Sequence, residues 1–330
     1  MKQFKKVLES KMKWGIAGCG YFAENSVIPA IKLLRRNRVI AVFSNSLDRA
    51  RTLSQKFSIK DYSNDFQKFL EGDFNALYVT SANKDHYHQV IQAARAGKHI
   101  ICEKPLAMNS AQAKEMIQTC KENNVKLSIG YVQRFHPLTI KAKEILENGM
   151  IGKLVLVNVS QSMNYAPGEN YRFKKGLSGG GTLRDVGTHC IDLLRYFGGE
   201  ITQIKGFIDN VIYQSEVEDF SIGSIKYKSG GFGNFYASYC ISKPINRLEI
   251  IGYKGTLIIE NLIGRRFDYA KLSIMLEGQT KKAFRRRGNK LIYLLKNFQS
   301  AVLKGTPLLV TGEDGLINMQ LMEELERSCG

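Results

Sequence analysis

A regular alternation of strand and helix patterns over the first 130 residues places the strongest constraint on the fold. Apolar runs predict strands at 13–18, 39–44, 75–81, 99–103 and 126–131. The helices between them are predicted from segments with helical spacing at 26–36, 47–57, 86–97 and 110–124. Strands that alternate with helices of this length indicate a parallel, doubly wound sheet. We therefore predict an α/β fold with a Rossmann domain over residues 1–132.

The pattern changes after a predicted helix at 137–148. Seven strand patterns lie between residues 153 and 277, and most are joined by short turns such as 228–231. Short turns between strands are typical of antiparallel pairing, and two further helices close the chain. We predict a second, α+β domain with a large, mostly antiparallel sheet over residues 133–330. Residues 1–11 precede Met12, and we expect them to be an extension or a misassigned start without a function.

The composition indicates a globular protein without a membrane segment. Apolar residues make up 44% of the chain, and no apolar run approaches the ~18 residues that a membrane span needs. The basic N-terminus lacks the apolar core of a secretory signal. Six cysteines are scattered without a CxxC pair, which argues against a zinc site or a disulfide framework. We expect a cytoplasmic protein with no membrane association and no metal.

The net charge of +18 raises the question of an anionic partner. Such a charge suits nucleic acid, anionic membrane surfaces or acidic small molecules. The densest basic run, "KKAFRRRGNK" at 281–290, holds one aromatic residue and no repeated stacking pattern, so we expect a solvated loop. Nucleic-acid binding through this run stays as an alternative, and it predicts a DNA affinity that falls steeply with salt.

A glycine-rich turn follows the first predicted strand. Residues 18–23 read Gly-Cys-Gly-Tyr-Phe-Ala, a G-x-G-x-x-A pattern that ends a strand, opens a helix and lies in a βαβ unit of about 30 residues. Gly18 permits the tight turn, and Gly20 lets the backbone approach a pyrophosphate that the helix N-terminus stabilises. Ala23 allows the helix to pack closely on the strand. This context favours a dinucleotide-binding site over an ordinary glycine turn.

The end of the second predicted strand bears on the choice of cofactor. An acidic residue there would bind the ribose 2′-hydroxyl of NAD. This chain has Ser44, Asn45 and Ser46 instead, with Arg49 shortly beyond, and we expect Asp48 to cap the following helix. A strand end without a carboxylate and with an arginine nearby tolerates a 2′-phosphate. We therefore favour NADP(H) as the cofactor and keep NAD(H) open.

Two further stretches carry reactive side chains. Glu103 and Lys104 follow a predicted strand in "HIICEKPLAMN", and open α/β sheets bind ligands at the carboxyl ends of their strands. In "GGGTLRDVGTHCIDLLRYFGG", Asp185, His189 and Asp192 stand at i, i+4 and i+7, on one face of a helix. A histidine oriented by a carboxylate makes a good general base. The preceding glycines let the loop approach another group closely, and no third metal ligand is evident nearby.

Together these stretches resemble the glucose–fructose oxidoreductase, inositol dehydrogenase and rhizopine-catabolism (Gfo/Idh/MocA) family from about Lys13 to the C-terminus. The motifs that carry the resemblance are "GIAGCGYFA", "TSANKDHYHQVIQAARAGKHIICEKP", "GYVQRFHP" with "NGMIGKL", and "GGGTLRDVGTHCIDLLRYFGG". The EKP tripeptide combined with D-x-G-x-H-x-x-D is specific to this family. The proline of the family's P-N-x-x-H loop is Ala82 here, which puts the exact geometry at Asn83 and His86 in question.

The resemblance implies roles for individual residues. Lys104 is implied to lie beside the nicotinamide and the reacting carbon as a catalytic residue, and its bond to Pro105 is often cis in relatives. Asp185 and His189 match the family's acid–histidine pair, which handles the substrate proton. Cofactor contacts are expected from Gly18, Gly20, Tyr21, Phe22, Ser44, Asn45, Arg49, Ser81, Asn83, His86, Glu103 and Lys104. Substrate contacts are expected from Arg172, Asp185, His189 and Asp192.

The leading hypothesis is an NAD(P)-dependent oxidoreductase acting on a polyol, a sugar or a sugar derivative. Because the chain has a high net positive charge, an anionic substrate such as a phosphorylated or nucleotide-linked sugar is attractive. The alternative is a dinucleotide-binding regulator of the same fold without catalysis, which need not keep the set of Lys104, Asp185 and His189. An NAD-dependent glycosidase of the same superfamily also stays open. Because relatives often dimerise through the open face of the second domain's sheet, we expect a homodimer or homotetramer.

Overall fold

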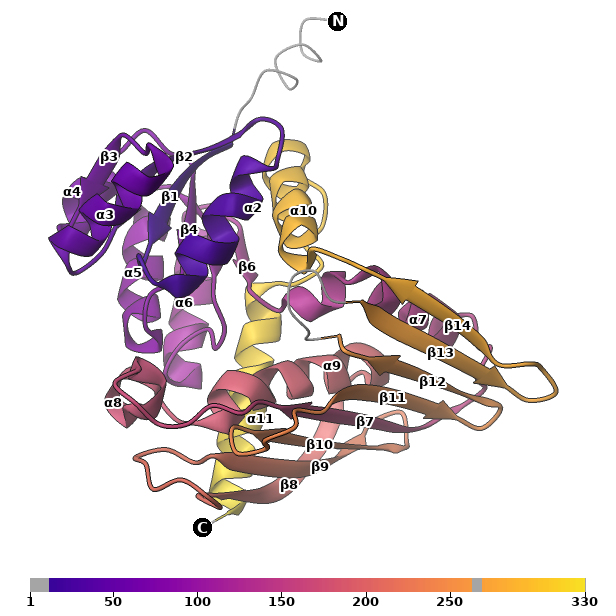
Figure 1. Cartoon of the computed structure of the whole chain (residues 1–330). Coiled ribbons are helices and arrows are strands. Elements are labelled where there is room, and N and C mark those ends of the chain that lie inside the picture. The colour runs from indigo at the N-terminus through magenta and orange to yellow at the C-terminus, as the bar shows by residue number, and fades with distance from the viewer. Residues whose placement is uncertain (1–11, 263–268, 330) are drawn as a thin grey trace, which may run out of the picture. The chain divides into compact units, whose positions relative to one another are not determined.

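The computed structural model describes residues 12–262 and 269–329 (Figure 1). The expected extension, residues 1–11, lies outside the described residues. Two compact units are present. The first contains the chain up to residue 130 together with 291–316, and the second contains 131–290 and the residues from 317 onward. The predicted division near residue 132 assigned 291–316 to the second domain, whereas this segment belongs to the first unit.

The first unit is built on a six-stranded parallel sheet with the strand order β3-β2-β1-β4-β5-β6. The strands are β1 (Met12–Ala17), β2 (Asn37–Phe43), β3 (Asp61–Ser63), β4 (Ala76–Val79), β5 (His99–Cys102) and β6 (Leu127–Ile129). The helices are η1 (Ala23–Val27), α2 (Ile28–Lys32), α3 (Leu47–Phe57), α4 (Phe66–Leu70), α5 (Asn83–Arg95) and α6 (Ser110–Glu122). The predicted doubly wound fold is confirmed. Its strand order reverses between β1 and β4, where such sheets bind ligands.

Helix α10 (Lys290–Lys304) packs in the first unit from residue 291 onward. Its apolar side is buried, and the Phe298 ring lies 5.6 Å from the ring of Trp14 on β1. Farther along the segment, the Ser128 hydroxyl donates a hydrogen bond to the Val310 carbonyl at 2.9 Å. These contacts join residues far apart in sequence, which explains why a division by chain order missed them.

The second unit is built on an eight-stranded sheet with the order β14-β13-β12-β11-β7-β10-β9-β8. Its strands are β7 (Leu154–Ser162), β8 (Ile201–Asp209), β9 (Phe220–Tyr227), β10 (Phe232–Ser238), β11 (Asn246–Gly252), β12 (Gly255–Glu260), β13 (Ala270–Leu276) and β14 (Lys282–Arg286). Neighbouring strands are antiparallel except β7 and β10, so the predicted mostly antiparallel sheet is confirmed. The helices are η2 (Val132–Phe135), α7 (Pro137–Glu147), η3 (Tyr171–Phe173), α8 (Lys175–Ser178), η4 (Leu183–Gly187), α9 (Thr188–Gly198) and α11 (Gly312–Ser328), whose residues from 317 onward belong here.

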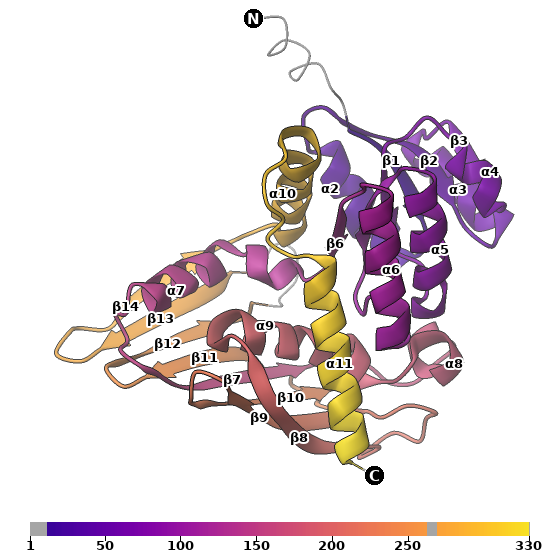
Figure 2. The same cartoon turned by 180° about the vertical axis from the view of Figure 1, so that it is seen from behind.

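Helices cover one face of this second sheet. Helix α7 packs on β12, β13 and β14, and α9 packs on β7 and β10 (Figure 2). The strands also carry large apolar side chains that stay exposed, and Phe207, Ile222 and Phe232 are 76%, 42% and 58% exposed. Phe207 and Ile222 are direct partners in the register of β8 and β9. The second unit therefore has an apolar sheet surface that its own helices do not cover.

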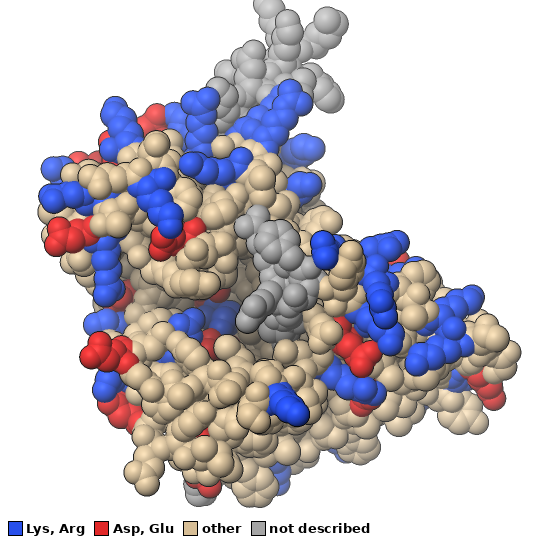
Figure 3. Space-filling view, in the orientation of Figure 1, with Lys and Arg blue, Asp and Glu red and all other residues tan. Residues whose placement is uncertain are grey.

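Residues 282–286 of the basic run at 281–290 form a strand, β14, rather than the expected loop. Strand β14 lies at one end of the sheet order and pairs with β13. Lysine and arginine side chains crowd this part of the surface (Figure 3), and Arg285 and Arg286 are exposed. Charged side chains on an edge strand discourage its pairing with a further strand. The run thus has a structural explanation that needs no nucleic-acid partner.

A buried ion pair anchors α9. Asp192 is 1% exposed, and its carboxylate accepts hydrogen bonds from Nε and Nη2 of Arg134 at 2.9 and 2.6 Å. Asn318 of α11 donates to the same carboxylate at 3.2 Å. Because both charges lie inside the unit, each compensates the other where water does not reach.

Replacing Asp192 by Asn should lower the free energy of unfolding by about 3–5 kcal/mol, because it removes the charge that compensates buried Arg134. The double variant Arg134→Met/Asp192→Leu should lose less, because it removes both buried charges. Chemical denaturation measures these values. Lys228→Met, which removes the exposed partner of Glu200, should change stability by less than about 1 kcal/mol. A double variant as unstable as Asp192→Asn would contradict this interpretation.

Candidate active site

The turn after β1 brings two strand ends into contact. Gly18 has a φ of +101°, and a Cβ built on it would lie 2.5 Å from the backbone nitrogen of Ser81, which follows β4. The Thr80 hydroxyl donates a hydrogen bond to the Gly18 carbonyl at 2.8 Å. Glycine alone suits both the positive φ and this close approach. The predicted tight turn therefore lies at the reversal of strand order.

The residues after Gly18 present an exposed stretch of backbone. A Cβ on Gly20 would meet nothing within 4 Å, and Tyr21 is 82% exposed. Phe22 is 36% exposed, whereas Ala23 is fully buried at the start of η1. Open backbone at a helix start, with a small residue packed beneath it, suits the pyrophosphate of a dinucleotide.

A groove of about 480 Å³ opens between this turn and α3. It is lined by Cys19, Gly20, Tyr21, Glu24, Asp48, Arg49, Thr52, Leu53 and Lys56. The structure thus brings three of the predicted cofactor contacts, Gly20, Tyr21 and Arg49, to one groove. Burial raises the pKa of the Cys19 thiol to about 12, so this thiol stays protonated at neutral pH.

The start of α3 corrects one expectation. Ser46, rather than Asp48, caps this helix by accepting the backbone N–H of Arg49 at 3.4 Å. Ser44 is 9% exposed, and its hydroxyl accepts the N–H of Ser46 at 3.2 Å, so this oxygen supports the turn. Asn45 is exposed. The three residues directly after β2 carry no carboxylate.

The segment after β5 holds Glu103 against a buried tyrosine. The Tyr78 hydroxyl donates to Glu103 Oε1 at 2.8 Å, and burial and the Glu103 carboxylate raise the pKa of Tyr78. A Cβ on Gly130 would lie 2.7 Å from the same oxygen, so glycine leaves room for the carboxylate there. Lys104 is half-buried, and the Lys104–Pro105 peptide bond is cis.

His86 links this segment to the turn after β4. Its imidazole has no exposed surface, with Nδ1 2.9 Å from the Pro105 carbonyl oxygen and Nε2 3.2 Å from that of Ser81. Burial lowers the pKa of His86, which favours a neutral ring with a single N–H. A ring without exposed surface offers a cofactor no contact, so His86 ties two loops together instead of forming the predicted cofactor contact. Asn83, at the start of α5, is 6% exposed.

In the second unit, Asp185 is the centre of a polar cluster. It lies in η4, a single turn of π-helix that leads into α9, and such turns are frequent at functional sites. Its Oδ2 accepts the Tyr239 hydroxyl at 2.8 Å and Nε of Arg172 at 3.2 Å. Burial and the Asp185 carboxylate raise the pKa of Tyr239, so the phenol donates without ionising. The sequence analysis missed Tyr239, which lies 54 residues away and belongs to no recognised motif.

His189 follows in the first turn of α9. The helical path from η4 into α9 places it one turn after Asp185, as the i, i+4 spacing predicts. Its half-buried ring meets Tyr131 edge to face, with centroids 6.0 Å apart. Tyr131 is itself held by a hydrogen bond of 2.8 Å with the Thr188 hydroxyl. The imidazole therefore has a fixed neighbour while part of its surface stays accessible.

Aromatic rings surround the polar cluster. Tyr165, Phe173 and Tyr239 lie with ring centroids 5.4 to 5.7 Å apart. The guanidinium of Arg172 lies 4.9 Å from the centre of the Tyr171 ring. Burial acts against the charge of Arg172, but the neighbouring carboxylate and tyrosines raise the pKa of this guanidinium, so the ion pair persists. Polar groups set in an aromatic surface suit a small polar ligand.

The structure groups most of the predicted site residues within each unit. Those of the first unit follow the carboxyl ends of β1, β2, β4 and β5, and they are Gly18, Gly20, Tyr21, Phe22, Ser44, Asn45, Arg49, Ser81, Asn83, His86, Glu103 and Lys104. In the second unit, Arg172 contacts Asp185, and His189 lies one turn beyond. Asp192 is buried against Arg134, so we assign it the support of α9 rather than the predicted substrate contact.

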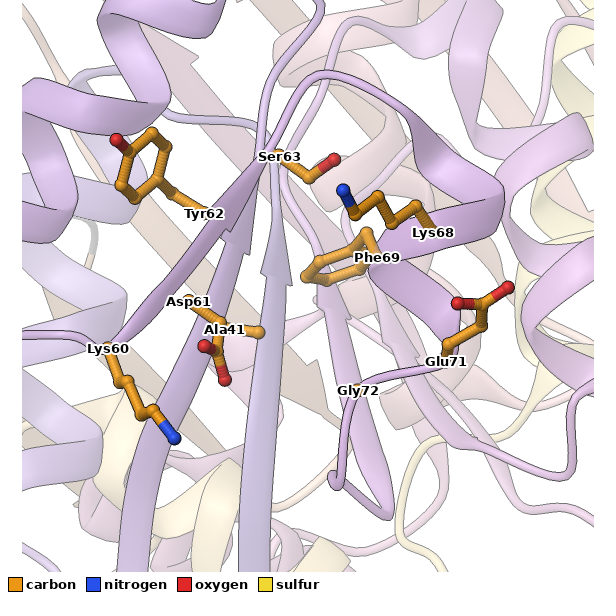
Figure 4. Close-up of a pocket in the computed structure, with 9 residues that line it drawn as sticks. All are labelled: Ala41, Lys60, Asp61, Tyr62, Ser63, Lys68, Phe69, Glu71 and Gly72. Atoms are coloured by element: carbon orange, nitrogen blue, oxygen red, sulfur yellow. The ribbon is translucent and has the colours of Figure 1, made fainter.

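A separate cavity of about 400 Å³ lies along β3, at the outer edge of the first unit's sheet (Figure 4). It is lined by Ala41, Lys60, Asp61, Tyr62, Ser63, Lys68, Phe69, Glu71 and Gly72. These residues include none of the predicted site residues, and the charged ones are exposed and of both signs. We assign no function to this cavity.

Within residues 12–262 and 269–329, no helix combines the length and the apolar character needed to cross a membrane. The same residues contain no group of three or more His, Cys, Asp or Glu side chains that could hold a metal ion.

Known protein families and individual proteins are similar to this chain in both units. The family model described as "Oxidoreductase family, NAD-binding Rossmann fold" matches residues 12–131, and the "GFO/IDH/MocA C-terminal domain" model matches residues 139–258. The 1,5-anhydro-D-fructose reductase of Ensifer adhaerens is 26% identical over 92% of this chain and 92% of its own. The myo-inositol 2-dehydrogenase of Thermotoga maritima is 27% identical over 94% of each chain. The crystal structure of aldose-aldose oxidoreductase from Caulobacter crescentus, complexed with glycerol, has a TM-score of 0.89 and 26% identity, covering 96% of this chain and 97% of that chain.

Replacing His86 by Leu should lower the free energy of unfolding by about 1–3 kcal/mol, because the carbonyl oxygen of Ser81 or Pro105 that accepts the single ring N–H loses its donor. It should also weaken dinucleotide binding, because the loops after β4 and β5 lose their link. Denaturation and a fluorescence titration with NADPH measure the two effects. His88→Leu, two residues farther along α5 and exposed, is the matched control. Equal behaviour of the two variants would contradict the linking role.

Proposed function

Because the chain belongs to the Gfo/Idh/MocA oxidoreductase family, we propose that it transfers hydride between a nicotinamide cofactor and a hydroxyl-bearing carbon of a sugar, a sugar derivative or a polyol. The observation that carries this proposal is the cluster at Asp185, where Tyr239 and Arg172 hold a carboxylate one helical turn before His189. A regulator that only binds a dinucleotide has no need of a histidine and a carboxylate held in this way.

The proposed cofactor site is the carboxyl edge of the first unit's sheet. The residues fit the group, because the backbone at Gly20 is exposed and the groove beside it is lined by Arg49. An arginine in that groove, with no carboxylate directly after β2, supports NADP(H) over NAD(H). Glu103 supplies a further polar contact toward the nicotinamide ribose, since Tyr78 fixes its carboxylate.

The protein's own groups would manage the proton of the substrate oxygen. When bound, the nicotinamide accepts or donates the hydride. In the oxidative direction, His189 takes the hydroxyl proton as general base, and the Lys104 ammonium stabilises the negative charge that develops on the oxygen. Asp185 stabilises the imidazolium that forms, and Arg172 and Tyr239 hold its carboxylate in place by donating hydrogen bonds to it. In the reductive direction the same proton returns to the oxygen.

The charge pattern around Asp185 supports an uncharged substrate. The Arg172 guanidinium is paired with Asp185 through Nε, and this carboxylate offsets the positive charge that a phosphate would need. Lys174, two residues farther on, is paired with Glu216. These pairs favour sugars and polyols of the kind named in the relatives over the phosphorylated or nucleotide-linked sugars that the overall charge suggested.

We propose that the protein is a homo-oligomer that uses the uncovered face of the second unit's sheet. Phe207, Ile222 and Phe232 are large apolar side chains that remain exposed on its strands. Apolar surface of this kind commonly marks a protein interface. A homodimer or a homotetramer would cover it.

Lys104→Ala should lower kcat by at least about 100-fold, because the oxygen loses the charge that stabilises it, and NADPH affinity should change less than about twofold. Nicotinamide absorbance would measure turnover on a panel containing myo-inositol, 1,5-anhydro-D-fructose and aldoses. Lys84→Ala, at an exposed position near the start of α5, is the matched control. Undiminished turnover in Lys104→Ala would remove the proposed mechanism. A wild-type protein that binds NADPH and turns over nothing in the panel would favour the regulator.

Arg49→Ala should weaken NADPH binding by about 10- to 100-fold and leave NADH binding unchanged, because only NADPH carries the 2′-phosphate. Fluorescence titration of the emptied protein measures both affinities. Arg51→Ala, on the same helix but outside the groove, controls for the loss of one positive charge. Equal losses for NADH and NADPH would show that Arg49 does not select the cofactor.

A further inference from the structure

Glu218 holds the turn that leads into the helix carrying Asp185 and His189. It precedes β9, and its Oε2 accepts the backbone N–H of Gly181 at 2.9 Å. Its Oε1 accepts the N–H of Leu183 at 3.0 Å, and its main-chain carbonyl accepts that of Thr182 at 3.1 Å. Three consecutive amides are thus bound by one residue, which fixes the backbone just before η4.

The glycine at 181 makes this contact possible. A Cβ there would lie 2.0 Å from the Glu218 carbonyl oxygen, so any larger residue would push the turn away. The Gly181 carbonyl in turn accepts the backbone N–H of Asp185 at 3.0 Å. A short chain of hydrogen bonds therefore runs from the Glu218 carboxylate through Gly181 to the backbone of Asp185. The group that the glycine-rich loop was expected to approach is Glu218.

Backbone amides partly offset the effect of burial on Glu218, whose pKa remains above its usual range. Burial raises the pKa of Glu218, while the amides of Gly181 and Leu183 act in the opposite direction. It lies at the N-terminal end of the helical run formed by η4 and α9, where a negative charge is favourable. The neighbouring carboxylate of Glu326 is neutralised by Arg184, with contacts of 2.8 and 2.6 Å.

We propose that Glu218 is the positioning residue for the acid–histidine pair, an inference that rests on the proposed function. It acts through the backbone at 181–185 and needs no contact with the substrate. Without its carboxylate, the amides of Gly181 and Leu183 lose their acceptor, and the turn relaxes. Asp185 then no longer meets Tyr239 and Arg172 at the present distances, and a misplacement of this kind is costly for catalysis.

The variant Glu218→Gln tests this role, because it keeps the shape of the side chain and removes the charge. We expect kcat to fall by about 10- to 100-fold, while NADPH affinity changes less than about twofold. Hydrogen–deuterium exchange should become faster in peptides covering residues 180–187. Glu200→Gln, which alters an exposed carboxylate after the other end of α9, should leave both measurements at wild-type values.

Several outcomes would decide between this role and others. Wild-type kcat and exchange in Glu218→Gln would overturn the proposal, and so would a lower melting temperature with an unchanged kcat per folded molecule. If Glu218→Gln does not fold, Glu218→Asp takes its place, because it keeps the charge on a shorter side chain. Its kcat should lie below the wild-type value, and exchange at 180–187 should be faster than in the wild type. A wild-type protein without turnover would refute the proposed function, and exchange at 180–187 would still report whether Glu218 holds the turn.

Discussion

The contact between Gly18 and the backbone after β4 is the constraint on which the first unit depends. Because no side chain fits there, the ends of β1 and β4 remain within van der Waals distance, at the point where the strand order reverses. The hydroxyl of Thr80 secures the same contact with a hydrogen bond to the Gly18 carbonyl. The loops that follow both strands then start from fixed positions, and His86 ties one of them to the segment after β5. A steric requirement at one residue thus organises the whole carboxyl edge.

In the second unit, carboxylates fix the positions of the loops and helices. Glu218 binds the amides before η4, and the fully buried Asp219 accepts three consecutive N–H groups from residues 211–213 at 2.6 to 2.9 Å. Asp192 pairs with Arg134 in the interior. The Asp185 side chain is 19% exposed and accepts from the side chains of Arg172 and Tyr239. In a chain with a net charge of +18, these acids hold backbone amides and an arginine in place, and Asp185 is the one that the proposed mechanism uses.

Local patterns sufficed to predict the two sheets, the glycine turn and the shared helical face of Asp185 and His189. Each of these depends on residues close together in sequence. The details that depend on distant partners were missed, such as Tyr239 beside Asp185 and the burial of Asp192 by Arg134. The cap of α3 was assigned to Asp48 although Ser46 forms it, because both residue types are common caps and only the backbone path distinguishes them. The proposed roles of Lys104 in catalysis and of Arg49 in cofactor selection are defined by contacts with bound ligands. A sequence pattern does not specify such contacts.

The charged strand β14 has a consequence for how copies of this protein can associate. An uncharged edge strand would allow one sheet to continue into the next, and repeated addition of that kind leads to open-ended fibres. The exposed arginines of β14 repel the same strand of another molecule, so growth along this edge is suppressed. In the proposed homo-oligomer, association through the apolar sheet face would be self-complementary and would end once two faces have met. The basic run would then restrict association to that face, and so to closed assemblies of defined size.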